Sequence, residues 1–408
     1  MTLRSQPLII TCARGLADPL AAEVRMRGIP VTDAGPDFVA ATGGWPEIYQ
    51  LNLWLQTGNR ALWRVGAEDV LAPEDVPRAV GRLAWEEWLP ADGYFTVRAA
   101  VAESVLRDPR QAALRVKDAI VDRIRARRGR RPDSGGEDDR GAAVFARLNG
   151  TRLELFLDTS GRSLSQRGYR LQPWRAPLRE TLAAGIVGLI GWDGRAPFVN
   201  PMCGSGTLGI EAALRALNRA PGLLREHFAF RHLLGHDEAA WQAARRTAAA
   251  LARPATAAPI LLSDIAPGAL RAAAANAARA GVADALQFAR GDFADTPVPP
   301  DGGGVVLLNP EYGERLGADH ELAETYRRIG DFFKQRCGGY RGYVFTGNLP
   351  LAKRIGLRSA RRLTLFNGPL ECRLLEFELY AGTRKPRAAE ADSAAAGPTP
   401  QTPVPPVG

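Results

Sequence analysis

The chain has 408 residues, of which 46% are hydrophobic and 24% charged, and its formal net charge is +9. This composition is ordinary for a globular protein and excludes collagen, coiled coil and wholesale disorder, while the length predicts two or three domains. No run of about 18 apolar residues occurs and no cleavage pattern follows the N-terminus, so we expect no transmembrane helix, signal peptide or membrane partner.

The first segment, residues 1–60, alternates short strand and helix signals. Apolar and β-branched residues predict strands at 8–11 and 38–41. Apolar periodicity predicts helices over 18–27, which Gly28 ends, and over 45–55.

Residues 61–168 repeat this mixture. We predict a strand at 94–99 and a hairpin of strands 143–148 and 153–157 around Asn149-Gly150. An amphipathic helix is expected over 111–128, with an apolar face formed by Ala112, Leu114, Val116, Ile120, Val121 and Ile124. This half is therefore predicted to be α+β and built on small sheets, with a polar loop at 131–139.

A basic block overlaps this predicted helix. Residues 107–131 carry ten basic and three acidic side chains and end in a run of arginines. Clustered arginines displace the counterions of nucleic-acid phosphates, so the block is a candidate RNA-binding surface. A solvated helix end is the alternative interpretation.

After residue 169 strands alternate with long helices, which predicts an α/β domain with a doubly wound, mostly parallel sheet. Its parallel strands are expected at 198–199, 259–263, 286–288, 304–308 and 343–346. A terminal antiparallel hairpin is expected from 362–366 and 372–380. Residues 384–408 are rich in Ala, Pro, Thr and Ser, which predicts a disordered tail.

A glycine-rich segment follows the first of these parallel strands. It comprises Asn200, Pro201, Met202, Cys203, Gly204, Ser205, Gly206 and Thr207. Glycines allow a sharp turn and the close approach of a ligand, and the following helix N-terminus offers N–H groups. Gly204, Gly206 and Gly209 match GxGxxG, but no acidic residue ends a second strand about 20 residues later, which disfavours a dinucleotide. A plain strand–helix turn is the structural alternative.

Two carboxylates follow the next two predicted strands. Asp264 precedes Ile265 and is suited to accept both ribose hydroxyls of a nucleoside, although it is equally suited to cap the helix that begins at Pro267. Asp292 is suited to accept from an adenine amino group while Phe293 covers the ring.

A fourth strand end carries Asn309-Pro310-Glu311-Tyr312. The Asn309 side chain and the Pro310 carbonyl are two acceptors that can bind both hydrogens of an exocyclic amine. Tyr312 is suited to stack on the base. A proline turn is the default for Asn-Pro alone, but the other candidate sites lie at the same predicted sheet edge.

These segments, together with 165–170 and 176–184, resemble the class I S-adenosylmethionine-dependent RNA methyltransferases that carry a THUMP domain. Bacterial 23S rRNA guanine-N2 methyltransferases are the most similar group. The resemblance spans residues 1–382. It implies a ferredoxin-like segment at 1–60, a THUMP domain at 61–168 and a Rossmann-like methyltransferase domain at 169–383.

The resemblance also implies the site residues. S-adenosylmethionine would be held by Thr181, Asn200, Met202, Cys203, Gly204, Ser205, Gly206, Asp264, Ile265, Asp292, Phe293 and Asn309. Asn309, Pro310 and Tyr312 would present guanine N2 for direct displacement of the methyl group, without a metal or covalent intermediate. Structured RNA is the implied partner, 23S rRNA first and tRNA second. In many bacteria a second methyltransferase domain follows this one. Because the chain ends first, we expect a single activity.

Two residues depart from the family pattern. Asn200 stands where the glycine loop usually begins with Asp, and Glu311 replaces the second proline of Asn-Pro-Pro-Tyr. The alternatives are a tRNA guanine-N2 methyltransferase and a catalytically weak RNA-binding or ribosome assembly factor, which Glu311 favours. An NAD-dependent enzyme is a third class that Asp264 does not exclude.

The cysteines and histidines suggest no further chemistry. Cys12, Cys203, Cys337 and Cys372 lack CxxC spacing, so we expect reduced thiols in a cytoplasmic protein. His232 and His236 lie four residues apart without an HExxH pattern, and we expect no metal site. The oligomeric state is left open.

Overall fold

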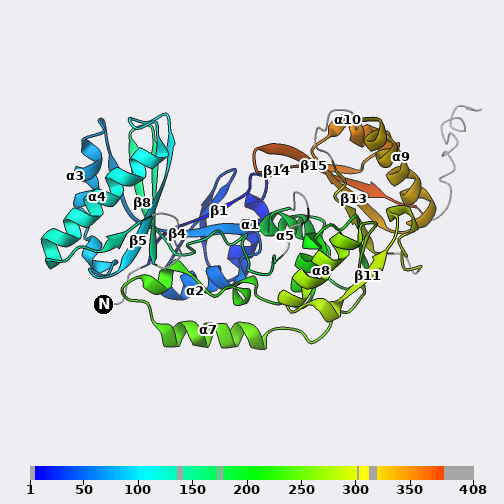
Figure 1. Ribbon diagram of the computed structural model, residues 1–408, viewed down its shortest axis with the longest axis horizontal. Coiled ribbons are helices and arrows are strands. Elements are labelled where there is room, and N and C mark those ends of the chain that lie inside the picture. The colour runs from blue at the N-terminus through cyan, green and yellow to red at the C-terminus, as the bar shows by residue number, and fades with distance from the viewer. Residues whose placement is uncertain are drawn as a thin grey trace, which may run out of the picture.

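The computed structural model describes residues 5–135, 141–171, 174, 178–300, 303–311 and 319–380. The described strands form two sheets, which lie in opposite halves of an elongated molecule (Figure 1). The predicted tail at 384–408 and residues 136–139 of the predicted 131–139 loop lie outside the described residues. No helix in the described ranges is long and apolar enough to cross a membrane.

The N-terminal sheet has eight strands in the order β2-β3-β1-β4-β8-β7-β5-β6. They are β1 (Gln6–Cys12), β2 (Val31–Ala34), β3 (Phe38–Gly43), β4 (Gly58–Asp69), β5 (Tyr94–Ala102), β6 (Asp133–Ser134), β7 (Ala142–Asn149) and β8 (Arg152–Asp158). The strands predicted in this half and the β7–β8 hairpin are confirmed. Two predictions are wrong, because β6 is a short strand within the predicted polar loop and because the strands do not form separate small sheets.

The long strand β4 is the reason that one sheet forms. Its first half pairs with β1, where Leu8 faces Trp63, and its second half pairs with β8, where Asp69 faces Arg152. A register shift between Arg64 and Gly66 interrupts the alternation of side chains. The apolar pattern of β4 is therefore too irregular to be recognised in the sequence.

Helices cover one face of this sheet: α1 (Ala17–Met26), α2 (Trp45–Trp54), α3 (Asp75–Gly81) and α4 (Pro109–Arg128). The carboxylate of Asp108 caps α4 by accepting from the Arg110 N–H at 2.8 Å, and Gly129 ends it at φ 67°. Five of the six predicted apolar residues of α4 are buried. Leu114 is the exception, with 55% of its surface exposed, because it lies on the solvent side of the helix.

The C-terminal sheet has seven strands in the order β11-β10-β9-β12-β13-β15-β14. The first five are parallel: β9 (Phe198–Pro201), β10 (Ile260–Asp264), β11 (Leu286–Arg290), β12 (Val305–Leu308) and β13 (Arg341–Thr346). The last two, β14 (Arg361–Asn367) and β15 (Leu370–Glu378), form the predicted antiparallel hairpin. Strand order reverses between β9 and β12, and in open α/β sheets ligands bind at such a point.

Helices pack on both faces of this sheet. Alternate residues of β9, β10 and β12 belong to different apolar clusters, since Phe198 and Leu262 lie in one cluster and Val199 and Leu261 in the other. The first cluster includes residues of α5 (Glu180–Leu189), α6 (Thr207–Ala216), α7 (Glu238–Ala250) and α8 (Pro267–Arg279). The second includes α9 (Asp319–Arg336) and α10 (Leu349–Ala352). The doubly wound fold is therefore confirmed.

The two halves are packed directly against each other. A Cβ on Gly222 would lie 2.3 Å from the backbone oxygen of Asn52, so the chain after α6 approaches α2 closely. Buried Arg167 donates to Glu211 of α6 at 2.8 Å and to the carbonyl of Gln56 at 2.7 Å. Burial raises the pKa of Glu211, while the Arg167 charge acts in the opposite direction. This ion pair fixes the N-terminal module to the C-terminal sheet.

Candidate functional site

The candidate site lies where β9, β10 and β12 end. The N–H of Gly204 donates to Asp264 Oδ2 at 2.9 Å, which joins the glycine loop after β9 to the end of β10. The N–H of Cys203 donates to the carbonyl of Ser263 at 3.0 Å. The Asn200 side chain donates to the carbonyl of Leu307 in β12 at 2.8 Å. Residues predicted from three separate segments are thus brought to one edge of the sheet.

The glycine loop requires the residues found there. Gly204 and Gly206 have φ values of 54° and 80°, which glycine adopts without strain, whereas Met202, at φ 54°, takes a conformation that residues with a Cβ rarely adopt. A Cβ on Gly206 would lie 2.9 Å from Ala273, and one on Gly209 would lie 2.5 Å from Leu262. Gly206 and Gly209 therefore allow α6 to pack closely on its neighbours.

Gly204 differs from these two glycines because its surroundings are open. The nearest atom to a Cβ there belongs to Trp174, at 4.0 Å. The backbone of Gly204 is therefore accessible to a ligand. Trp174 also lies beside Gly268 at the start of α8, so its ring flanks the loop. The sequence analysis did not identify Trp174, because this residue lies between the α+β and α/β segments and belongs to no recognisable motif.

Asp264 makes the contact expected of a residue that caps the start of α8, and its role toward a ribose stays a prediction. Its Oδ1 accepts from the N–H of Ala266 at 2.9 Å, as a cap of α8 would, while Oδ2 holds Gly204. The next side chain, Ile265, has 65% of its surface exposed. An exposed isoleucine beside a fixed carboxylate is suited to the apolar face of a nucleoside base.

Asp292 and Phe293 lie after β11 and contact a residue that the sequence analysis missed. Asp292 Oδ1 accepts from the N–H of Ala294 at 2.9 Å and from Arg328 at 2.7 Å. The Arg328 guanidinium lies 5.0 Å from the centroid of the Phe293 ring. Arg328 belongs to α9, far along the chain, so no local pattern connects it with this site.

Two buried amide oxygens face no donor. Among the described residues, Asn200 Oδ1 and Asn309 Oδ1 have no hydrogen-bond partner. Such groups normally find one, so each is an acceptor available to a ligand. The Pro310 ring is buried, and the carbonyl of Glu311 accepts from Tyr326 at 3.5 Å. Tyr312 lies outside the described residues, as do 176–177 of the predicted 176–184 segment.

Thr181 is buried and donates its hydroxyl to Asn59 of β4 at 2.8 Å. Within the described residues, the hydrogen bond of this side chain runs to Asn59 and not to the glycine loop. The link runs instead through its neighbour Glu180, which accepts from Arg170 at 3.0 Å. Arg170 also donates to Ser205 and Thr207. The side chain of Thr181 therefore contacts the N-terminal module.

The thiol of Cys203 is not a nucleophile at neutral pH. Burial raises its pKa, and the nearby negative charge of Asp264 raises it further. The other three cysteines are buried and reduced as well. Covalent catalysis through this cysteine is therefore disfavoured.

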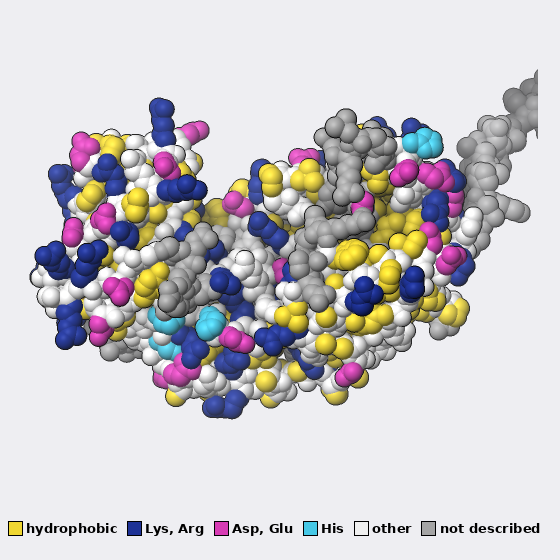
Figure 2. Space-filling model, viewed as in Figure 1, with side chains coloured by type: hydrophobic (Ala, Val, Ile, Leu, Met, Phe, Trp, Pro, Cys, Tyr) yellow, Lys and Arg dark blue, Asp and Glu magenta, His cyan; other side chains and the backbone are white. Residues whose placement is uncertain are grey.

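A second feature is a cavity of about 1100 Å³ between the uncovered face of the N-terminal sheet and the chain that leads to the C-terminal sheet. Figure 2 shows this hollow between the two halves, with arginine and histidine side chains around it. We call it the arginine trough; it is lined in part by Phe38, Arg60, Phe145, Arg147, Arg162, Arg179, Arg225 and His227. The sequence analysis missed it because its residues come from segments that lie far apart in the chain.

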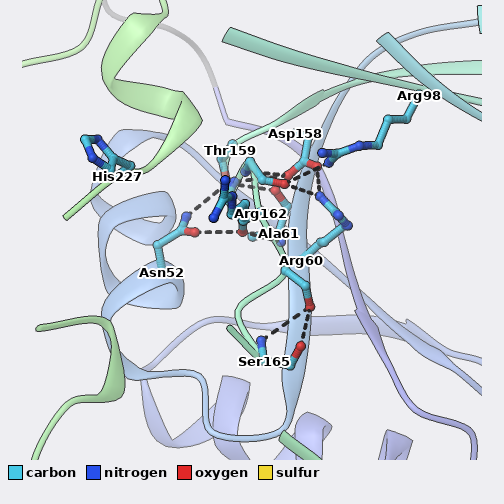
Figure 3. A network of polar contacts seen from close by, with 12 residues as sticks. Asn52, Arg60, Ala61, Arg98, Asp158, Thr159, Arg162, Ser165 and His227 are labelled. Atoms are coloured by element: carbon cyan, nitrogen blue, oxygen red, sulfur yellow. Dashed lines mark hydrogen bonds and ion pairs between the residues drawn. The ribbon is translucent and has the colours of Figure 1, made fainter. Parts of the chain in front are cut away.

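The turn after Asp158 shapes one wall of the arginine trough (Figure 3). Asp158 accepts from the N–H groups of Ser160 and Gly161 and pairs with Arg60. Arg98 donates to the carbonyl of Gly161 at 3.1 Å. Buried Arg225 donates to backbone carbonyls of the same turn and of 162–166, so its charge stabilises this connection between the halves.

The predicted basic block, residues 107–131, spans α4 and the residues that flank it, away from the candidate site (Figure 1). Arg123 is engaged, since it donates two hydrogen bonds to Glu86. Arg127 and Arg130 have 61% and 73% of their side chains exposed. Solvent-exposed arginines at the helix end are compatible with both interpretations given above.

The fold and site define a Rossmann-like methyltransferase architecture joined to an N-terminal RNA-binding type of module. Family models match in three stretches: an RlmL ferredoxin-like domain at residues 7–62, a THUMP domain at 73–134 and an RMKL-like methyltransferase domain at 167–376. The chain belongs to the family of RMKL-like methyltransferases with a THUMP domain. The resemblance identified from the sequence is thereby confirmed.

Individual relatives agree with this assignment. A ribosomal RNA large subunit methyltransferase K/L of Pseudomonas aeruginosa is 39% identical over 91% of this chain and 52% of its own length. A putative RNA methyltransferase of Synechocystis is 35% identical over 92% of this chain and 97% of its own. The solved structure of SMU.472, a putative methyltransferase complexed with SAH, is 28% identical, covers 93% of this chain and 99% of its own, and superposes with a TM-score of 0.83. The chain spans about half the length of the K/L relatives that it matches.

Proposed function

We propose that this chain transfers a methyl group from S-adenosylmethionine to the exocyclic N2 of a guanine in 23S rRNA. The observation that carries the proposal is the buried, unpartnered Asn309 Oδ1 at the switch point of the sheet. The names of the K/L relatives support ribosomal RNA as the substrate. The SAH complex of the SMU.472 structure supports the cofactor.

The residues at the sheet edge fit S-adenosylmethionine. The open backbone at Gly204 and the unpartnered Asn200 Oδ1 suit the methionine end. Asp264 and exposed Ile265 suit the ribose and one face of adenine, and Asp292 with Phe293 suits its amino edge. When bound, the cofactor supplies an electrophilic methyl group.

The chain's own contribution is then alignment. Asn309 Oδ1 accepts one amine hydrogen and the Pro310 carbonyl accepts the other, which directs the nitrogen lone pair toward the methyl carbon. Holding the two reactants in this geometry is the main source of the rate enhancement. A base drawn out of a duplex costs a few kcal/mol. Stacking on an aromatic ring, the role proposed for Tyr312, returns about 1–3 kcal/mol.

Structured RNA is the proposed partner, and the arginine trough and the end of α4 are its proposed contact surfaces. Both present arginines, which pair with phosphates. Phe38 and Phe145 in the trough add partly exposed rings that can stack on unpaired bases.

The test is transfer of labelled methyl groups to 23S rRNA and to bulk tRNA, both from a strain that lacks the gene, followed by nucleoside analysis. We expect N2-methylguanosine in rRNA only. Asn309→Ala should lower kcat/KM by about 100-fold or more, because an oriented acceptor in the transition state is lost. Asn149→Ala, on an exposed hairpin, is the matched control.

Other outcomes distinguish the alternatives. N2-methylguanosine in tRNA alone would indicate that the chain is a tRNA methyltransferase. No transfer to either RNA, with S-adenosylmethionine binding intact, would support a non-catalytic RNA-binding role. Restoration of transfer by Glu311→Pro would assign that loss to Glu311.

A further inference from the structure

Helix α9 reaches back to the residues that follow β11. Arg328 donates to Asp292 Oδ1 at 2.7 Å, and its guanidinium lies 5.0 Å from the Phe293 ring centroid. The far side of that ring packs edge-on against Phe332, with centroids 6.1 Å apart. One helix therefore holds both residues proposed for the adenine amino edge.

The contact fixes which carboxylate oxygen is available. Asp292 Oδ1 already accepts from the N–H of Ala294 and from Arg328. Oδ2 is the oxygen left for a further donor. The side chains of Arg328 and Asp292 are 39% and 28% exposed, so the pair is partly desolvated and its hydrogen bond is charge-assisted.

The contact is specific to this position on α9. The adjacent Arg327 pairs with Glu324 and Asp331 of its own helix and is 58% exposed. It thus offers the same residue type at the next position without a contact to Asp292.

We propose that Arg328 is a positioning residue for the adenine end of the cofactor. It holds the Asp292 carboxylate so that Oδ2 accepts the adenine amino group, and it keeps the Phe293 ring in place beside the base. The proposal rests on the cofactor role proposed for Asp292, and it concerns binding of the cofactor independently of the RNA substrate.

The test is calorimetric titration of the full chain with S-adenosylhomocysteine. We expect Arg328→Ala to raise the Kd about tenfold, since a charge-assisted hydrogen bond and a ring contact are lost. Arg328→Lys should recover part of the affinity, because lysine keeps the positive charge but lacks the planar guanidinium group of arginine. Arg327→Ala should stay within about twofold of the parent.

A second ligand separates positioning from a general structural defect. S-inosylhomocysteine lacks the adenine amino group, so Asp292 cannot accept a hydrogen bond from an amino group at that position. Its binding should be weaker in the parent and should fall less than that of S-adenosylhomocysteine in Arg328→Ala, because only the Phe293 contact is then lost. With RNA present, Arg328→Ala should raise the KM for S-adenosylmethionine while kcat stays within about twofold.

Three results would overturn the proposal. One is an unchanged Kd in Arg328→Ala, and another is an equal loss in Arg327→Ala. The third is an equal loss for both ligands, which would indicate a disturbed fold. If the expected binding of S-adenosylhomocysteine is found but no methyl group is transferred to RNA, the positioning role of Arg328 stands and the proposed function fails.

Discussion

At the scale of single residues, the two amide oxygens at the sheet edge carry the functional argument. Asn200 lies in β9 and Asn309 follows the neighbouring strand β12, and both oxygens are buried without a partner among the described residues. Sequence reasoning predicted which residue types stand here, because polar residues after apolar strands are visible in the sequence. It did not predict the bond from Asn200 to Leu307, which depends on the order of the strands. It also missed Arg328, which reaches Asp292 only through the packing of α9.

Asn200→Asp tests whether this bond matters. A carboxylate cannot donate to the Leu307 carbonyl and would face it in a fully buried site. We expect a loss of about 1–3 kcal/mol in unfolding free energy at neutral pH, although the family usually has aspartate here. Chemical denaturation of the two proteins measures this. Equal midpoints would show that the amide donor contributes nothing.

At the scale of secondary structure, the strongly periodic elements were predictable and the irregular ones were not. Helix α4 was predicted over 111–128 from its apolar face, and the structure has it at Pro109–Arg128 with every predicted apolar residue except Leu114 buried. Strand β4 was missed because the register shift at Arg64–Gly66 breaks its alternation. Helix α7 was missed as well, since it is alanine-rich and buries only Trp241 and Ala248. Tertiary contacts hold it, through Tyr49 of α2, which contacts His236 at 2.9 Å.

The first turn of α7 gives a pH-dependent contribution to stability. Hydrogen bonds from Gln242 and His236, with the Arg231 charge, lower the pKa of Glu238 to about 2. A depressed pKa means that the contribution is present above the ordinary value of 4.5 and is lost as the pH falls toward 2. Urea midpoints of the parent and Glu238→Gln should therefore differ at pH 7 and converge through this window. A constant difference between the parent and Glu238→Gln across this pH range would contradict the assignment.

At the scale of the whole molecule, two modules share one apolar core and a buried ion pair. The main cluster of buried residues runs from Leu8 of β1 to Leu374 of β15. Arg167 and Arg225 add buried charges that bond across the connection. The arginine trough therefore lies between parts whose relative position is fixed by packing.

RNA binding should depend on both proposed surfaces. Arg162→Ser with Arg179→Ser in the trough, and Arg125→Ser with Arg128→Ser on α4, should each weaken RNA binding. Each pair should also reduce the slope of log K against log salt by about 1–2, as expected for lost phosphate contacts. Arg336→Ser, at an exposed arginine beyond both surfaces, is the control. An unchanged slope for either pair would remove that surface from the proposed interface.

The continuity of the N-terminal sheet has a consequence for the shape of the substrate. Strand β4 has 12 residues and spans about 40 Å at roughly 3.3 Å per residue, pairing with β1 at one end and with β8 at the other. A hydrogen-bonded strand cannot shorten or bend as a linker does. If the proposed RNA substrate is held at both ends of the molecule, we expect it to be selected by the distance between its reactive base and its bound stem, because β4 keeps those ends at a set separation.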